Sequence, residues 1–367
     1  MTFKNYADPL TVCGKALAQM SSAMKMPWAV KGALMPDTHA GYALPIGAVV
    51  ATKDVVVPAW VGYDIGCGMC AYKMDFYNPD SIKDNLSAIY TEIAANIPVG
   101  FKGNTISLPV DTSGLTQMGK QAISKKNPGA QLGTLGGGNH FIELGLDESN
   151  ELWCIIHSGS RGVGHALATH YMKLAGGGKA REDHCPLSLD TVEGKSYMQD
   201  LAWGLKFALD NRATMMQRVL DSIATVLGVT KRKLDKSTMI NRNHNHAEIK
   251  DGLVIHRKGA THAEYGMMGV IPGNMQDGSF IVKGKGNPEA LFSSSHGAGR
   301  VLSRTQAKAQ VNIEEFKKSM VGIATGDLQN LIDEAPEAYK NIFDVMDMQK
   351  DLVEVVAHVK PILNLKG

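Results

Sequence analysis

The chain lacks the features that mark membrane proteins, secreted proteins and proteins that coat nucleic acids. No apolar run approaches the roughly 18 residues that a membrane span needs. The first ten residues show neither the basic start nor the apolar stretch of a signal peptide, and five cysteines in 367 residues do not make a disulfide framework. The 38 Lys and Arg residues nearly balance the 36 Asp and Glu residues, so no global positive field indicates a nucleic-acid partner. We therefore expect a soluble cytoplasmic protein without a membrane partner.

Glycine and apolar residues are abundant instead. The 39 glycines gather in short clusters between apolar runs, and a hydrophobic content of 44% is enough to bury a substantial core. Continuous apolar runs at 46–51 and 152–157 predict short strands. Apolar periodicity predicts helices over 79–97, 163–174 and 196–226.

The second half of the chain carries a hairpin signal and a helical ending. An Asp-Gly pair at 251–252 predicts a β-hairpin between strands 247–250 and 253–257. The apolar spacing after Pro336 predicts helix as far as Val356. Because no repeat or linker divides the sequence, we expect one domain over residues 1–367 of the α+β class, with central β-sheets and with surrounding and C-terminal helices.

A carboxylate and a thiol lie close together in one glycine-rich bend. Asp64 and Cys67 are three residues apart, so both can converge on one cation. A hard and a soft ligand together suit a borderline cation such as Mn²⁺ or Zn²⁺. Because Cys67-Gly-Met-Cys70 also has C-x-x-C spacing, a redox pair is an alternative, as is a plain pair of buried thiols.

Four histidines occupy bends of the same kind. His140 follows three glycines, His157 ends an apolar run, His244 precedes the hairpin, and His296 stands between a Ser run and Gly-Ala-Gly-Arg. Each alone fits a core histidine, but together with the Asp and the Cys they predict a metal site assembled in the fold. His296 also fits a nucleophile or an acid–base group beside a phosphate or oxyanion site. A Ser–His hydrolase is the alternative, although the sequence has no Gly-x-Ser-x-Gly elbow.

Ordered motifs along nearly the whole chain carry a resemblance to a known family. The motifs are Met35-Pro-Asp-Thr-His39-Ala-Gly, Asp64-Ile-Gly-Cys67-Gly-Met, Gly-Gly-Gly-Asn139-His140-Phe-Ile-Glu143, His157-Ser-Gly-Ser-Arg161, His244-Asn245, Arg257-Lys258-Gly-Ala, Ser295-His296-Gly-Ala-Gly-Arg and Lys366-Gly367. By these motifs the sequence resembles the RtcB RNA ligases, in a shorter bacterial form with a compact stretch at 99–131.

The resemblance implies a specific reaction. Such a ligase uses GTP and two Mn²⁺ ions to join an RNA 2′,3′-cyclic phosphate or 3′-phosphate end to a 5′-hydroxyl end. The reaction passes through a histidine–GMP intermediate, for which the resemblance nominates His296, and through an activated RNA 3′-end. Alternatives with the same residues are a metal-dependent RNA phosphoesterase and a protein that binds RNA ends without ligating them.

The resemblance also assigns residues and partners. It implies the metal ligands Asp64, Cys67, His140, His157 and His244, with Cys67 bridging both ions. It implies a guanylate pocket formed by Asn139, Phe141, Glu143, Asn245, Ser279, His296, Ala298, Gly299, Tyr339 and Lys366. Arg161, Lys258 and Arg300 are candidates for contacts with RNA phosphates. We expect a monomer that acts on tRNA or damaged ribosomal RNA, in repair or in tRNA splicing, with a release-factor-like protein as a partner.

Overall fold

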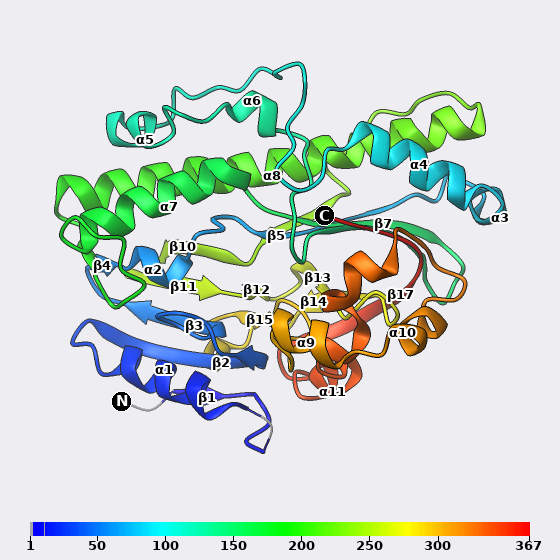
Figure 1. Ribbon diagram of the computed structural model, residues 1–367. Coiled ribbons are helices and arrows are strands. Elements are labelled where there is room, and N and C mark those ends of the chain that lie inside the picture. Colours follow the sequence, from blue (N-terminus) through cyan, green and yellow to red (C-terminus); the bar gives the residue numbers. More distant parts are fainter. Residues whose placement is uncertain (1–2, 11) are drawn as a thin grey trace.

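Two β-sheets form the centre of the fold in the computed structural model, which describes residues 3–10 and 12–367 (Figure 1). The first sheet has five strands in the order β1 (Lys4–Asn5), β2 (Ala29–His39), β3 (Ile46–Thr52), β11 (Leu253–Lys258) and β10 (Asn245–Lys250). The second has eight, in the order β13 (Met268–Pro272), β14 (Ser279–Gly284), β17 (Val353–Lys366), β6 (Phe141–Leu146), β7 (Leu152–Ser158), β5 (Gly68–Lys73) and β9 (Ile240–Asn243), with β16 (Ala324–Thr325) beside β17. Two small ribbons pair β12 (Ala260–His262) with β15 (Ser293–Ser295), and β4 (Val55–Val56) with β8 (Leu187–Ser188).

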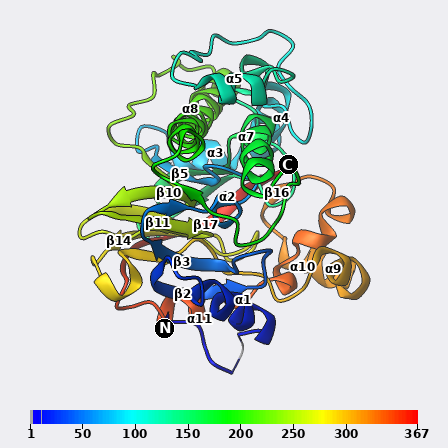
Figure 2. The same ribbon diagram turned by 90° about the vertical axis from the view of Figure 1, so that its left-hand side faces the viewer.

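Helices cover the outer faces of these sheets (Figures 1 and 2). The long helix α8 and its neighbour α7 lie side by side, and α1 packs on the first sheet in the same hydrophobic cluster as buried residues of α7 and α8. The helices are α1 (Gly14–Met24), α2 (Pro58–Val61), α3 (Pro79–Lys83), α4 (Leu86–Asn96), α5 (Gln117–Ala122), α6 (Pro128–Gln131), α7 (Arg161–Ala175), α8 (Val192–Leu227), α9 (Arg304–Gln310), α10 (Ile313–Ser319) and α11 (Ile342–Asp347). The predicted combination of central sheets and surrounding helices is confirmed. Across residues 3–10 and 12–367, no helix is both long and apolar enough to cross a bilayer.

The predicted hairpin and the strands predicted over 46–51, 152–157, 247–250 and 253–257 are present. The chain turns at Asp251 and Gly252, whose φ angles of 52° and 76° are both positive, as a two-residue turn of this type requires. Helix α8 begins earlier than the periodicity indicates, because the Thr191 side chain accepts a hydrogen bond from the backbone N–H of Gly194 and caps it.

Two helix predictions are wrong. The helix expected over 79–97 is divided into α3 and α4, because Asp84 and Asn85 end one helix and precede the next, and Asn85 lies outside helical geometry with ψ of 15°. The helix expected through Val356 ends at Asp347, and residues 353–366 form strand β17 between β14 and β6. The β-branched residues of this segment favour a strand, and pairing on both sides satisfies its backbone.

Candidate active site

Strand pairing in the second sheet brings the predicted metal ligands together. His140 immediately precedes β6, His157 lies near the end of β7, Cys67 immediately precedes β5, and His244 follows β9. These four strands are neighbours in the order β6-β7-β5-β9, and His157 pairs in register with Phe141 of β6 and with Met69 of β5. These four ligands therefore lie at the same end of neighbouring strands, although they are far apart in the sequence.

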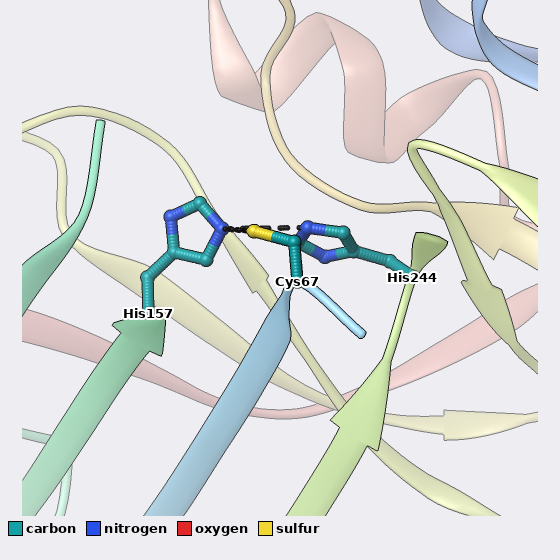
Figure 3. A group of neighbouring side chains, drawn as sticks. All are labelled: Cys67, His157 and His244. Atoms are coloured by element: carbon teal, nitrogen blue, oxygen red, sulfur yellow. Dashed lines mark hydrogen bonds between the residues drawn. The ribbon is translucent and has the colours of Figure 1, made fainter. Parts of the chain in front are cut away.

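The donor atoms of this group converge. Cys67 Sγ lies 3.5 Å from His140 Nε2 and 3.2 Å from His157 Nε2. His157 Nε2 is 3.3 Å from His244 Nε2, and His140 Nε2 is 3.2 Å from Asp64 Oδ2. Figure 3 shows the Cys67 sulfur between the rings of His157 and His244, which come from the ends of separate strands. The five residues predicted as metal ligands thus form one cluster.

In His140 and His157, hydrogen bonds from Nδ1 to backbone carbonyls leave the Nε2 atoms free to bind a cation. His140 Nδ1 lies 3.0 Å from the carbonyl of Leu135, and His157 Nδ1 lies 3.1 Å from the carbonyl of Asn139. A ring that donates its Nδ1 proton to a carbonyl keeps the Nε2 lone pair for a cation. Burial lowers the pKa of His157 and of His244 well below the usual value, so both rings are neutral, as metal ligands must be.

The cluster consists of two triads that share one thiol. Cys67, His157 and His244 form one, and Asp64, Cys67 and His140 form the other. Burial and the Asp64 carboxylate raise the pKa of the Cys67 thiol well above its usual value, so a cation is needed to hold the thiolate. Burial acts to raise the pKa of Asp64, but hydrogen bonding to His140 holds it at about 2. This donor set fits divalent cations, which the thiolate, the carboxylate and the imidazoles of the two triads would hold.

The second cysteine of the C-x-x-C motif lies in a different environment. Cys70 is fully buried in a hydrophobic cluster that includes Cys154 and Ile156, and burial raises the pKa of its thiol to about 12. All five cysteines are free. The arrangement favours the metal interpretation of Cys67 over the redox interpretation.

His296 is held by a buried carboxylate that the sequence did not single out. Asp37 Oδ2 lies 2.6 Å from His296 Nδ1 and accepts backbone hydrogen bonds from His296 at 3.1 Å and Gly297 at 3.2 Å. Because Nδ1 faces this carboxylate, the lone pair of Nε2 is left free. The ring of His296 packs at 4.8 Å, edge to face, on the ring of His244, so it adjoins the metal cluster. Gly259 permits this packing: its φ is 60°, and a Cβ there would lie 3.0 Å from His296 Cε1.

A cavity of about 830 Å³, counting its open mouth, begins at His296. Nine of the ten residues predicted for the guanylate pocket line it, namely Asn139, Phe141, Glu143, Ser279, His296, Ala298, Gly299, Tyr339 and Lys366. The exception is Asn245, whose Oδ1 accepts from the backbone of Gly259 at 2.8 Å and whose Nδ2 donates to the carbonyl of Asp64 at 3.2 Å. Asn245 thus fixes loops of the metal cluster and does not line the cavity.

Glu143 lines this cavity and is 1% exposed. Its carboxylate accepts hydrogen bonds from Ser279 Oγ at 3.0 Å and from Asn364 Nδ2 at 3.3 Å. Burial raises the pKa of Glu143 to about 8 despite these bonds and the charge of Lys366. The carboxyl group therefore holds a proton near neutral pH until a ligand supplies donors to its ionised form.

A second acidic residue, absent from the sequence predictions, organises the cavity wall. Glu334 is 2% exposed, and it accepts hydrogen bonds from Tyr339 Oη at 2.6 Å and Lys366 Nζ at 3.0 Å. Arg300 Nη1 lies 3.1 Å from its other oxygen. Glu334 follows no motif along the chain, so only its position in the fold reveals this role.

The three candidate RNA contacts lie in different places. Arg300 lines the cavity beside Tyr339, and Arg161 lies near Asp64 on another side of the metal cluster. Lys258 is 7% exposed and donates to the carbonyl of Ala59 at 3.1 Å, and burial lowers its pKa to about 8. Lys258 is thus the least accessible of the three to an RNA phosphate.

Comparison with known proteins places this architecture in one class of enzyme. The sequence model of the family described as tRNA-splicing ligase RtcB matches residues 19–127 and 111–367. The chain therefore belongs to the RtcB family of RNA ligases.

Curated relatives agree over almost the full length. The chain is similar to the RNA-splicing ligase RtcB of Escherichia coli K12, with 36% identity over 99% of this chain and 97% of the relative. It is similar to the tRNA-splicing ligase RtcB of Nanoarchaeum equitans at 29% identity, over 96% of this chain and 92% of that one. The RNA-splicing ligase RtcB2 of another E. coli strain is 29% identical over 98% of this chain and 94% of its own length.

Proposed function

We propose that this chain is a GTP- and Mn²⁺-dependent ligase that joins an RNA 2′,3′-cyclic phosphate or 3′-phosphate end to a 5′-hydroxyl end. Family membership supports the RNA ligase activity. The observation that carries the finer proposal is the placement of His296, which is held by Asp37 at the boundary between the cavity that it lines and the cluster of candidate metal-ligating side chains.

Asp64, Cys67, His140, His157 and His244 are the residues that would hold the cations. Their converging donors and backbone-anchored imidazoles fit this role. Bound Mn²⁺ ions supply charge neutralisation for the phosphates of the nucleotide and of the RNA end. The side chains of the cluster fix where those phosphates lie relative to His296.

The first step is attack by His296 on GTP. Its Nε2 lone pair forms a bond to the α-phosphorus, and the bond from that phosphorus to pyrophosphate breaks. Asp37 accepts a hydrogen bond from Nδ1–H and stabilises the positive charge that develops on the ring. A phosphoramidate joins His296 to GMP at the end of this step.

RNA then takes the place of pyrophosphate. Water first opens a cyclic phosphate end to a 3′-phosphate, whose oxygen attacks the phosphorus of GMP and releases His296. The resulting anhydride activates the RNA 3′-end, so attack by the 5′-hydroxyl forms the phosphodiester and releases GMP. Each step exchanges one bond to phosphorus for another, and no oxidant or reductant is needed.

The cavity chemistry supports guanine as the base. Glu143, once ionised, presents two acceptor oxygens that suit the N1–H and N2–H donors of guanine, whereas adenine presents an acceptor at N1. Lys366 and Tyr339 adjoin the same cavity and offer donors to the purine carbonyl and the sugar. GTP selection over ATP is therefore proposed to reside in Glu143.

The first experiment is incubation with α-³²P-GTP and Mn²⁺ followed by denaturing electrophoresis. The parent protein should take up an acid-labile, alkali-stable label from GTP and none from α-³²P-ATP. His296→Ala should take up none, while the matched control His358→Ala, which removes a ring stacked on Phe280, should be labelled normally. Normal RNA sealing by His296→Ala would refute the covalent mechanism.

The physiological RNA is part of the proposal as well. We propose ends of tRNA or damaged ribosomal RNA, arising in splicing or repair, and a single-domain monomer that works in the cytoplasm with a release-factor-like partner. Ligation of matched broken tRNA and ribosomal RNA fragments, with and without added partner, measures which substrate is preferred. Equal rates on unrelated RNA hairpins would contradict a dedicated substrate.

A further inference from the structure

His39 lines the cavity at His296, but none of the proposed reaction steps uses it. It is the last residue of β2 and ends the Met35-Pro-Asp-Thr-His39 motif. Its in-register partner across the sheet is Ile46 of β3, which lines the same cavity. The ring is only partly buried, so it is accessible to a molecule in the cavity.

One hydrogen bond sets the protonation of the His39 ring. Its Nδ1 lies 3.0 Å from the carbonyl oxygen of Asp37, and a carbonyl oxygen can only accept. Nδ1 therefore carries the proton, and Nε2 presents a lone pair. Burial lowers the pKa of His39 to about 4, so the ring keeps this neutral form at neutral pH.

The lone pair of Nε2 has no partner within the described protein. Across residues 3–10 and 12–367, the only hydrogen bond of the His39 side chain is the one at Nδ1. Nε2 does not belong to the fully buried polar atoms that lack a partner, so it is open to solvent. An acceptor that is open to solvent on a cavity wall is available to a donor group of a ligand.

Asp37 places His39 at the same end of the cavity as His296. Its carbonyl binds His39, while its carboxylate binds His296 Nδ1. Gly299 lets this segment approach closely, because its φ is 79° and a Cβ there would clash with the Asp37 carbonyl oxygen. Lys340 Nζ donates to the carbonyls on either side of Asp37, at 3.1 and 3.0 Å. Both imidazoles are therefore anchored to one residue that is itself held in place.

The chemistry of GTP limits what His39 can contact. When the α-phosphorus lies at His296 and the base at Glu143, the groups next to the α-phosphorus are the ribose and the β-phosphate. Phosphate oxygens are acceptors at neutral pH, so they do not pair with a lone pair. The only hydroxyl groups of GTP are the two on the ribose, and a hydroxyl can donate to an imidazole nitrogen.

We propose that Nε2 of His39 accepts a hydrogen bond from a ribose hydroxyl of GTP, so that this residue makes nucleotide uptake depend on the sugar. The inference rests on the proposed function, in which GTP occupies the cavity at His296. Base recognition by Glu143 and sugar recognition by His39 are then separate, because the two side chains contact different parts of the nucleotide.

The test measures single-turnover uptake of label from α-³²P-GTP, α-³²P-2′-dGTP and α-³²P-3′-dGTP, each below saturation and with Mn²⁺ present. The parent should take up at least one of the two deoxynucleotides about 2- to 13-fold more slowly than GTP, as expected for the loss of one neutral hydrogen bond. The deoxynucleotide that is taken up slowly identifies the hydroxyl.

His39→Phe keeps a ring of similar size but has no acceptor. It should take up GTP about as slowly as the parent takes up that deoxynucleotide, and it should no longer distinguish the two, because both changes remove the same contact. His39→Gln can place Oε1 near the position of Nε2 and should restore part of the discrimination. His184→Phe is the matched control, because His184 is also partly buried and hydrogen-bonded, to Trp60 Nε1 and Ser22 Oγ, outside the lining of this cavity. It should discriminate as the parent does.

Undiminished discrimination against the same deoxynucleotide by His39→Phe, or equal uptake of all three nucleotides by the parent, would overturn the inference. If His39→Phe takes up no label, calorimetric titration of the three nucleotides into this variant decides in the same way, because binding does not need the chemical step. A parent protein that takes up no GMP from GTP would instead contradict the proposed function, so the two failures are distinguishable.

Discussion

Replacement of Asp37 by asparagine removes one negative charge from the support of His296 without changing its size. Two backbone N–H groups, of His296 and Gly297, point at Oδ2 together with His296 Nδ1. The NH₂ group of an asparagine cannot occupy the position of Oδ2, because three N–H donors point at it. The amide oxygen must therefore occupy that position. The orientation and tautomer of the imidazole are then preserved, and only the charge is lost.

The size of the effect follows from that geometry. A hydrogen bond to a charged group contributes about 1.5–3 kcal/mol and a neutral one about 0.5–1.5 kcal/mol. The difference of about 1–1.5 kcal/mol should slow guanylation roughly 5- to 13-fold, because the charge on the ring develops in that step. Asp37→Ala should slow it much more, since it leaves three buried donors without an acceptor.

The assay is the single-turnover rate of GMP uptake from α-³²P-GTP at saturating nucleotide and Mn²⁺. Asp200→Asn is the matched control, because Asp200 is also buried and accepts bonds from Thr116 N and Oγ1, both at 2.7 Å. It should lose stability in urea without losing guanylation rate. A loss below twofold for Asp37→Asn, or a loss confined to GTP affinity, would refute the positioning role.

Three further predictions follow from the site. Cys67→Ser should not retain a pair of Mn²⁺ ions after gel filtration, whereas Cys70→Ser should have the metal content of the parent; equal metal content in both would exclude a bridging thiolate. Because burial raises the pKa of Glu143 to about 8, from about 4.5 in the unfolded chain, the folded protein holds an extra proton in this window and its stability should fall as pH rises, by at most about 1.4 kcal/mol per unit. Glu143→Gln should flatten that slope in urea unfolding, and an unchanged slope would refute the assignment. Glu334→Gln should raise the KM for GTP more than it lowers kcat, because it releases Lys366; the opposite split would contradict this role.

The metal cluster was predictable from the sequence because of where its residues stand. His140, His157 and Cys67 each directly precede or end an apolar strand, and glycines around them indicate close approach of backbone segments. Residues at strand ends meet when their strands become neighbours, so the chemistry of the donors sufficed to predict convergence. The strand order that brings them together was not predictable, since it depends on pairing between distant segments.

Residues that act through a partner were harder to predict. Asp37 is 259 positions from His296, and only the packing of β2 against the segment after β15 joins them. Glu334 lies in a 3₁₀ segment without a motif. Asn245 remains a predicted nucleotide contact, and in this structure its side chain bonds to the backbone of Gly259 and Asp64. Over 353–356, apolar periodicity could not distinguish a helix from a strand that is paired on both sides.

Strand β17 belongs both to the second sheet and to the wall of the cavity at His296, so the sheet and the cavity form together. It separates β14 from β6, and its last residue, Lys366, pairs with Phe141 in the cavity wall. Displacement of this one strand would divide the sheet and remove Lys366 from Glu334 in the same event. A ligand that contacts Lys366 therefore stabilises the whole sheet against opening by mass action. Protection of β14 and β6 amides from hydrogen exchange should therefore rise together when nucleotide binds. Occupancy of the cavity would then stabilise the second sheet as one cooperative unit.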